Sequence, residues 1–77
     1  MVKIKLFGSL RLKTGCKGLD ADVPDVKSAC RLLADTTGHN IKEFKNCVVI
    51  INGKQAKHSS KLKDGDELVL MAAAGGG

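Results

Sequence analysis

The sequence predicts an α+β fold in which one main helix crosses a mixed sheet of four or five strands. Two observations carry this prediction. Over residues 2–7, "VKIKLF", apolar side chains alternate with basic ones, which is the two-residue period of a half-buried strand. Over residues 26–33, apolar side chains recur at spacings of three and four, which is the period of an amphipathic helix. A chain of 77 residues forms one domain with one modest core.

The segment after the first strand predicts a short helical turn and a second strand. "GSLRLKTG" lies between two glycines and has room for one turn, with Leu10 packed inward. Residues 19–23, "LDADV", alternate apolar and acidic side chains. We expect this segment to pair with the first strand as a loose hairpin, joined by the loop around Gly15 and Gly18.

The main helix is expected at about 25–37. Asp25 is a good N-cap, because its carboxylate can accept a hydrogen bond from a free amide in the first turn. Gly38 provides a left-handed cap at the other end. One apolar stripe faces the core: Val26, Ala29, Cys30 and Leu33. The stretch "HNIKEFKN" then reads as a connector, with Ile41 and Phe44 tucked under the edge of the sheet.

The last third of the chain predicts three strands. "CVVII" at 47–51 is apolar in both phases, which is typical of a covered or central strand. Asn52-Gly53 is a strong hairpin signal, and "KQAKH" returns as a short charged edge strand. Residues 66–71, "DELVLM", form the last strand. We expect the strands to contribute a core set to the helix stripe: Ile4, Leu6, Val48, Ile50, Leu68 and Leu70.

This order of elements is that of the ubiquitin-like β-grasp fold. Because a crossover between parallel strands is right-handed, the first and last strands can lie side by side in parallel. We therefore expect a β-grasp domain at 1–71 and a flexible Ala/Gly tail at 72–77.

Composition and charge narrow the functional classes. The net charge of +5 favours acidic partners, but the basic residues are dispersed and no aromatic residue lies among those at 54–63 to stack a base. Nucleic-acid binding is therefore not the favoured interpretation.

The three cysteines, Cys16, Cys30 and Cys47, are too few and too widely spaced for a disulfide framework or paired zinc ligands. No apolar stretch is long enough to span a membrane. Free thiols fit a reducing cytoplasm.

Enzymatic chemistry is not indicated. His39 and His58 fall in expected loops, without metal-ligand spacing and without a partner for nucleophilic catalysis. Cys30 and Cys47 read as small buried hydrophobes. Cys16 is expected in an exposed loop. We predict no catalytic residue, no metal and no bound cofactor.

The unusual feature is the end of the sequence, Gly75, Gly76 and Gly77 after three alanines. Six extended residues reach at most about 20 Å, and glycine allows close approach where a Cβ would clash. Such an arm can carry its carboxylate into the active site of another protein. There the carboxylate can attack the α-phosphorus of ATP, and the resulting acyl-adenylate can react with sulfur or nitrogen nucleophiles. A disordered end is the competing interpretation.

A docking face beside the tail is also expected. If Leu68 and Leu70 face the core, their strand neighbours face outward and form an apolar patch with residues of the adjacent strands. The expected patch consists of Phe7, Val49, Ile51, Val69 and Met71. The alternative is a second buried layer under the 41–44 connector.

The sequence resembles the MoaD/ThiS family of sulfur-carrier proteins. The resemblance rests on "LFGSLR", "VVIING", "LKDGDELVLM" and the glycine end, and it covers nearly the whole chain. It implies that an adenylyltransferase related to ubiquitin-activating enzymes uses ATP to adenylate the terminal glycine. A persulfide then converts that glycine to a thiocarboxylate. The family pair of glycines corresponds to Gly76 and Gly77, or to Gly75 and Gly76 if one residue is removed.

The resemblance leaves the recipient of the sulfur open. "LFGSLR" favours the MoaD branch, which donates sulfur to a pterin inside a molybdopterin synthase. Donation to the thiazole of thiamine comes next. A ubiquitin-like protein modifier or a sulfur donor for tRNA thiolation uses the same terminus. A small basic β-grasp module that binds a protein or RNA is the alternative of another class.

Overall fold

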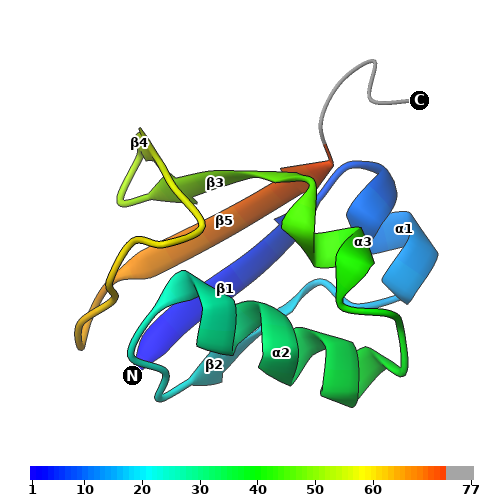
Figure 1. Cartoon of the computed structure of the whole chain (residues 1–77), viewed down its shortest axis with the longest axis horizontal. Helices are drawn as coiled ribbons and strands as arrows, with labels where there is room; N and C mark the ends of the chain where they lie inside the picture. Colours follow the sequence, from blue (N-terminus) through cyan, green and yellow to red (C-terminus); the bar gives the residue numbers. More distant parts are fainter. Residues whose placement is uncertain (73–77) are drawn as a thin grey trace.

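A computed structural model describes residues 1–72, and residues 73–77 lie outside the described part. In chain order the elements are β1 (Val2–Phe7), α1 (Ser9–Thr14), β2 (Gly18–Ala21), α2 (Val26–Thr37), α3 (Lys42–Lys45), β3 (Cys47–Ile51), β4 (Lys54–Ala56) and β5 (Glu67–Ala72). The strands form a five-stranded sheet in the order β2-β1-β5-β3-β4 (Figure 1). The predicted β-grasp fold with a mixed sheet and one main helix is confirmed.

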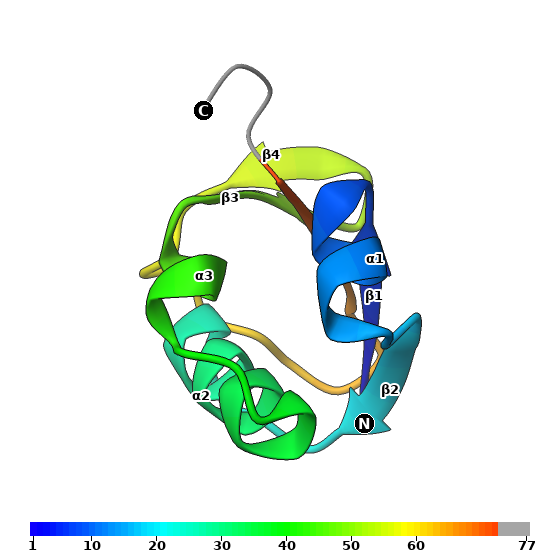
Figure 2. The ribbon, with the colours of Figure 1, turned by 90° about the vertical axis from the view of Figure 1, so that its right-hand side faces the viewer.

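The sheet curves around α2, which lies across its inner face (Figure 2). β1 and β5 form the only parallel pair of the described sheet, with partners running from Lys3↔Glu67 to Phe7↔Met71. The prediction that the first and last strands lie side by side in parallel is confirmed. The edges are β2 on one side and β4 on the other.

Helix α2 begins and ends where its sequence predicts. The Asp25 carboxylate accepts the Ser28 backbone N–H at 2.8 Å, and this bond holds the pKa of Asp25 below its usual value. Gly38 ends the helix with a φ of 75°, in the left-handed region. The predicted apolar stripe is buried against the sheet: Val26, Ala29, Cys30 and Leu33.

Two short helices flank the main one. The predicted turn after β1 is α1, and its Leu10 is buried as expected. The connector at 39–46 contains α3, which had not been predicted as a helix because four residues are too few to show a period. Its Phe44 is fully buried beneath the sheet, as expected, and Ile41 is partly buried beside it.

The side chains of β3 face the opposite way from the prediction. Val49 is only 2% exposed and faces the core, whereas Val48 and Ile50 point outward and are half-buried. The cause is the register with β5, which places Val49 opposite the buried Leu70. Directly opposed residues of an antiparallel pair share a face, so the whole strand follows this pairing. The apolar run "CVVII" alone did not reveal its phase.

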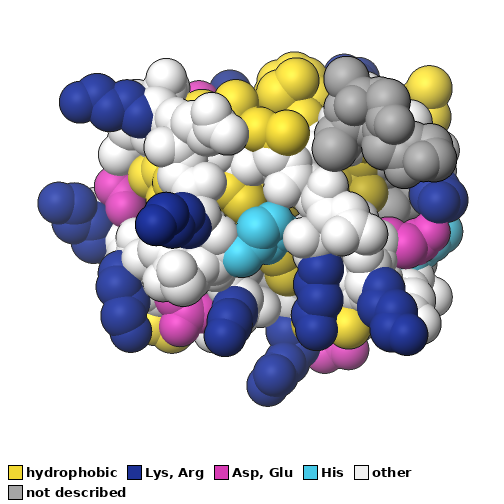
Figure 3. Space-filling model, turned by 45° about the horizontal axis from the view of Figure 1, so that its top comes forward, with side chains coloured by type: hydrophobic (Ala, Val, Ile, Leu, Met, Phe, Trp, Pro, Cys, Tyr) yellow, Lys and Arg dark blue, Asp and Glu magenta, His cyan; other side chains and the backbone are white. Residues whose placement is uncertain are grey.

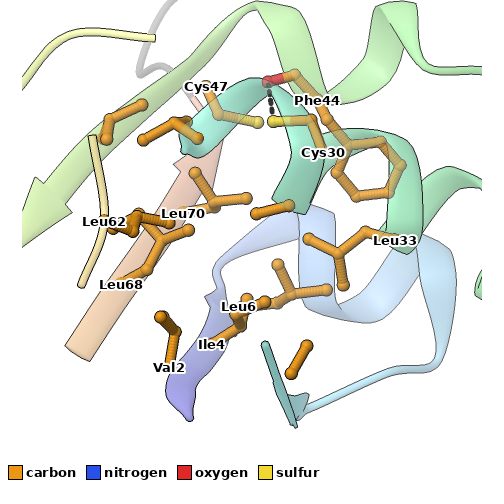
Figure 4. Packing of buried hydrophobic residues seen from close by; sticks show 14 of the residues in the cluster. Val2, Ile4, Leu6, Cys30, Leu33, Phe44, Cys47, Leu62, Leu68 and Leu70 are labelled. Carbon is orange, nitrogen blue, oxygen red and sulfur yellow. Dashed lines mark hydrogen bonds between the residues drawn. The ribbon is translucent and has the colours of Figure 1, made fainter. Parts of the chain in front are cut away.

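Cys30 and Cys47 lie in the core, as the sequence predicted (Figure 4). The Sγ of Cys30 lies 3.9 Å from the carbonyl oxygen of Phe44, and the Sγ of Cys47 lies 3.3 Å from that of Glu43. Burial raises the pKa of the Cys30 thiol to about 11, so this thiol is protonated at neutral pH. Cys16 is half-buried rather than exposed, with its Sγ 3.8 Å from the carbonyl oxygen of Gly18.

The β3–β4 hairpin turns as its sequence predicts. Asn52 and Gly53 both have positive φ, at 52° and 83°, which a two-residue primed turn requires. The amide of Asn52 also donates to the carboxylate of Asp66 at 2.9 Å and accepts from the N–H of Glu67. The hairpin is thereby tied to the start of β5.

The last strand has the predicted length but lies one residue further along the chain than the predicted 66–71. β5 includes Ala72, the first residue of the predicted 72–77 tail. The other five residues of that tail lie outside the described residues. Within 1–72 we find no helix with the length and apolar character needed to cross a bilayer.

Candidate partner-docking face

The outer face of the sheet, turned away from α2, carries an apolar patch. Two rows of paired residues build it across the central strands. Phe7 pairs with Met71, which pairs with Val48 on its other side. In the next row Val69 lies opposite Ile50. We call these five residues the outer-face patch.

The outer-face patch is uncovered in the described part of the chain. Phe7 is 40% exposed and Met71 is 38% exposed, and both are among the large hydrophobic residues that remain in solvent. Val48, Ile50 and Val69 are half-buried by their neighbours in the sheet. Contiguous exposed apolar surface on a small protein marks a site of interaction. No second layer from the 41–44 connector covers this face, since Phe44 packs on the inner side.

Of the five residues predicted for the patch, the structure places three on the outer face and two on the inner face. Phe7, Val69 and Met71 lie together on the outer face, where they were expected. Val49 and Ile51 are on the inner face, because β3 has the opposite phase; Ile51 lies opposite the buried Leu68 and packs against the core.

Sequence reasoning missed Val48 and Ile50. The signal that locates them is the register between β3 and β5, which depends on the Asn52 turn and its bonds to the start of β5. That register is a long-range property, and nothing in residues 47–51 taken alone specifies it.

The outer-face patch adjoins the point at which the chain leaves the sheet. Met71 belongs to the patch, and the next residue, Ala72, makes the last pair of the ladder with Cys47. The predicted reactive residues, Gly75, Gly76 and Gly77, lie outside the described residues. The sheet therefore places the start of the predicted tail beside the patch.

A cavity lies beside Ala72, the last described residue of β5. It has a volume of about 300 Å³, lies between α1 and α3, and is lined by Ser9, Leu10, Lys13, Lys42, Glu43, Asn46 and Ala72. At its wall the ammonium of Lys13 lies 2.8 Å from the carboxylate of Glu43, which also contacts the Nδ1 of His39 at 2.7 Å. The bond from Lys13 holds the pKa of Glu43 below its usual value, so this carboxylate is ionised at neutral pH.

His58, the other histidine considered in the sequence, has a hydrogen-bond partner in the structure. The Nε2 of His58 donates to the carbonyl oxygen of Cys47 at 2.9 Å. Within residues 1–72, no three His, Cys, Asp or Glu side chains are grouped so that they could hold a metal ion.

A model of the ThiS family matches residues 4–77. The chain belongs to the ThiS family. The resemblance to the MoaD/ThiS sulfur carriers is thereby confirmed, and the fold is that of a ubiquitin-like sulfur carrier. No curated protein matches the chain in sequence.

Solved structures share the fold over nearly the whole chain. Small archaeal modifier protein 1 from Methanosarcina acetivorans has a TM-score of 0.80 at 24% identity, with 99% of this chain and 95% of that chain covered. A chain of the Amycolatopsis orientalis BexX/CysO complex gives 0.73 at 25% identity, with both chains fully covered at 100%. A chain of the complex of subunits 1 and 2 of the molybdopterin-converting factor from Helicobacter pylori gives 0.69 at 22% identity, covering 99% of this chain and 97% of that one.

Proposed function

We propose that this protein carries sulfur as a thiocarboxylate on its C-terminal glycine and donates it in cofactor biosynthesis. The observation that carries the proposal is the match to the ThiS family over residues 4–77, which includes the glycine end. The fold supports it, because β5 ends beside an uncovered apolar patch. The five residues after Ala72 can span at most about 18 Å, enough to reach an active site in a protein docked on the patch.

The chemistry proceeds in a partner enzyme related to ubiquitin-activating enzymes. The glycine carboxylate attacks the α-phosphorus of ATP, and pyrophosphate leaves. A persulfide attacks the acyl carbon of the resulting adenylate, and AMP leaves as an acyl disulfide forms. A second thiol of the sulfur donor then cleaves the S–S bond, which releases the thiocarboxylate and leaves a disulfide on the donor. This protein contributes its terminus and its docking surface, and ATP is bound by the partner.

The outer-face patch is the proposed docking surface for both partners. Its half-buried aliphatic residues supply apolar area, and Phe7 and Met71 supply the exposed side chains that a partner pocket can receive. An ion pair flanks it, with the Nζ of Lys5 3.4 Å from the Glu67 carboxylate. The activating enzyme and the sulfur acceptor therefore bind in turn rather than together.

Molybdopterin synthesis is the recipient that we favour, with the sulfur-accepting partner being a synthase large subunit. Support comes from the likeness to a chain in the complex of molybdopterin-converting factor subunits 1 and 2 and from the "LFGSLR" segment. The thiazole of thiamine is next. The free thiols of the chain suit the reducing cytoplasm.

A second candidate function is protein modification or tRNA thiolation. The observation that favours it is the likeness to small archaeal modifier protein 1 from Haloferax volcanii, at 25% identity and a TM-score of 0.76. An acyl-adenylate attacked by a lysine amine instead of sulfur gives an isopeptide bond. The terminus and the activation step are the same, so the two functions differ in the nucleophile.

Intact-mass spectrometry tests the proposal. The protein is incubated with a ubiquitin-activating-like adenylyltransferase, MgATP and sulfide, and we expect a gain of roughly 16 Da from exchange of oxygen for sulfur. The mass before reaction also shows whether Gly77 or Gly76 is the terminal residue. Transfer onto lysines gives a much larger adduct and supports the second function.

A truncated variant provides the control. Deleting Gly76 and Gly77 should abolish the gain in mass and leave the unfolding midpoint unchanged, because both residues follow the last strand. If the full-length protein gains no sulfur with an adenylyltransferase that is active on another carrier, the proposal is wrong.

A further inference from the structure

The helix side of the molecule carries a second concave surface, which the proposed function does not use. It has a volume of about 520 Å³, within the range of ligand pockets. Its lining residues come from α2, from α3 and the residue before it, and from the loop after β4, and Figure 1 shows how these elements are arranged. We call it the basic groove, and its lining residues are Lys27, Cys30, Arg31, Ile41, Lys45 and His58.

The rim of the basic groove is cationic. Lys27 and Arg31 are four residues apart on α2 and therefore share one face of that helix, and Lys45 ends α3. Within residues 1–72 none of these three side chains forms an ion pair with a carboxylate. Figure 3 shows several Lys and Arg side chains below a histidine on one face, with hydrophobic and some acidic side chains among them. No acidic residue lines the groove.

Of the carboxylates near these cations in sequence, Asp25 and Glu43 have other partners, and Asp35, four residues after Arg31 on α2, forms no ion pair within residues 1–72. Asp25 caps α2 through the N–H of Ser28, and Glu43 binds Lys13 and His39 on the far side of α3. None of the three cations is thus held in an ion pair within residues 1–72, and the charge of Lys27 helps to lower the pKa of Asp25. A cationic rim attracts negative charge and speeds association with an acidic partner.

The floor of the basic groove is apolar. Cys30 is buried and protonated at neutral pH, and the partly buried Ile41 lies beside it. His58 closes one side, with its ring held by the bond from Nε2 to the Cys47 carbonyl. A ligand for this surface needs carboxylates or other anions at its edges and an aliphatic group in its centre.

We propose that the basic groove binds an acidic segment of a partner protein, with Asp or Glu side chains at the three cations and an aliphatic side chain on Cys30 and Ile41. RNA fits less well, because neither phenylalanine is available to stack a base there: Phe44 is buried and Phe7 is on the outer face. At the start of α2 the N–H groups of Val26 and Ser28 already donate to Ser60 and Asp25, so these two groups are not free to hold a phosphate. The groove binds its partner while the outer-face patch and the terminus remain free for another.

Titration with a defined peptide tests the inference. The probe is a fluorescent nine-residue peptide that repeats Glu-Glu-Leu, and its matched control repeats Gln-Gln-Leu. Anisotropy should show saturable binding of the acidic peptide, and amide shifts in ¹H–¹⁵N spectra should cluster at residues 27–31, 41–45 and 58. The acidic peptide should bind at least about tenfold more tightly than its glutamine control.

Two pairs of substitutions separate a site from general positive charge. Arg31→Gln with Lys45→Gln should weaken binding of the acidic peptide about tenfold or more. Lys17→Gln with Lys54→Gln removes the same charge from exposed positions outside the groove and should weaken it less than about threefold. Ile41→Ala should weaken the Glu-Glu-Leu peptide but not a nonamer of glutamate alone. Thermal unfolding of each variant checks that the fold is retained.

Three outcomes overturn the inference: no saturable binding of the acidic peptide, equal losses for the two pairs of substitutions, or tighter binding of a nine-nucleotide single-stranded RNA at the same salt. Truncation after Ala72 should leave peptide binding unchanged. Because the inference does not depend on the terminus, its failure and the failure of the sulfur-carrier proposal are separate results.

Discussion

Strands β3 and β5 present apolar side chains on both of their faces, and the two faces meet different surroundings. On the inner face, Val49, Leu68 and Leu70 are at most 2% exposed under α2 and Phe44. On the outer face, the outer-face patch has no cover within the described residues, and Phe7 and Met71 keep more than a third of their surface in solvent. Composition is similar on both sides, so composition does not decide which face is the core.

The comparison indicates that an apolar face left uncovered by the domain has a role other than stabilising the fold. A small domain does not gain stability from leaving such side chains in solvent, because burial is what makes apolar area favourable, at about 25 cal/mol per Å². The inner face stabilises the fold, whereas the outer face is available to a partner. Substitutions on the two faces should therefore affect different measurements.

Leu70→Ala should have the largest effect. Its side chain is fully buried on the inner face of β5, which lies between β1 and β3, so truncation leaves a cavity and should lower the free energy of unfolding by about 2–5 kcal/mol. Urea denaturation followed by circular dichroism measures this loss. The neighbouring outer-face variant Met71→Ala should lose less than about 1 kcal/mol. Equal losses would contradict the distinction between the faces.

Met71→Asp should disrupt function more than folding. A carboxylate in the centre of the outer-face patch must be desolvated on docking, so adenylate formation by the activating enzyme should slow roughly ten- to a hundredfold. Pyrophosphate exchange measures that rate. Leu12→Asp is the matched control, because Leu12 is 85% exposed on α1, outside the patch. A similar slowing in both variants would point to net charge instead of docking.

Val49→Thr and Val48→Thr make the same change on adjacent residues of one strand. At Val49 the new hydroxyl is buried without a designed partner and should cost about 1–2 kcal/mol of unfolding free energy. At Val48 it meets solvent and should change that free energy by less than about 0.5 kcal/mol. Chemical denaturation of the pair measures the phase of β3 directly, and a reversed order would show that the phase is wrong.

A substitution of Asp66, the buried charged residue directly before β5, should have the smallest effect on stability. Its carboxylate accepts the N–H of Lys63 and the amide of Asn52, and these bonds hold its pKa below the usual 3.8. The folded-state pKa is lowered, so this stabilisation is present well above pH 3.8 and is lost as the pH falls through the folded-state value. Asp66→Asn should make the acid limb of the stability curve shallower. Thermal unfolding between pH 7 and pH 3 measures the slope, and an unchanged slope would exclude this role.

Sequence reasoning predicted the fold because its strongest signals are local. The cap at Asp25, the stripe of α2 and the Asn52-Gly53 turn each depend on neighbouring residues, and all three are present. It failed where the outcome depends on distant contacts. The phase of β3 is decided by its register with β5, and the structure of α3 depends on the burial of Phe44.

The same limit applied to the candidate site. The residues of β1 and β5 were assigned to the outer face because the alternation in β1 is clear and the phase assumed for β5 was correct. Val48 and Ile50 were exchanged for their neighbours, since a strand that is apolar at every position offers no alternation to read. The reactive glycines lie outside the described residues, and their role stays a prediction.

The parallel pairing of β1 with β5 has a mechanical consequence. The chain enters the sheet at one end of this pair and leaves it at the other, so a force that pulls the two ends apart acts along the strands. The load is then shared by the hydrogen bonds from Lys3↔Glu67 to Phe7↔Met71 at once, and they must break together rather than unzip one by one. An unfolding enzyme that pulls this domain by its C-terminal end therefore meets its strongest resistance at the start of unfolding, when β5 must separate from β1.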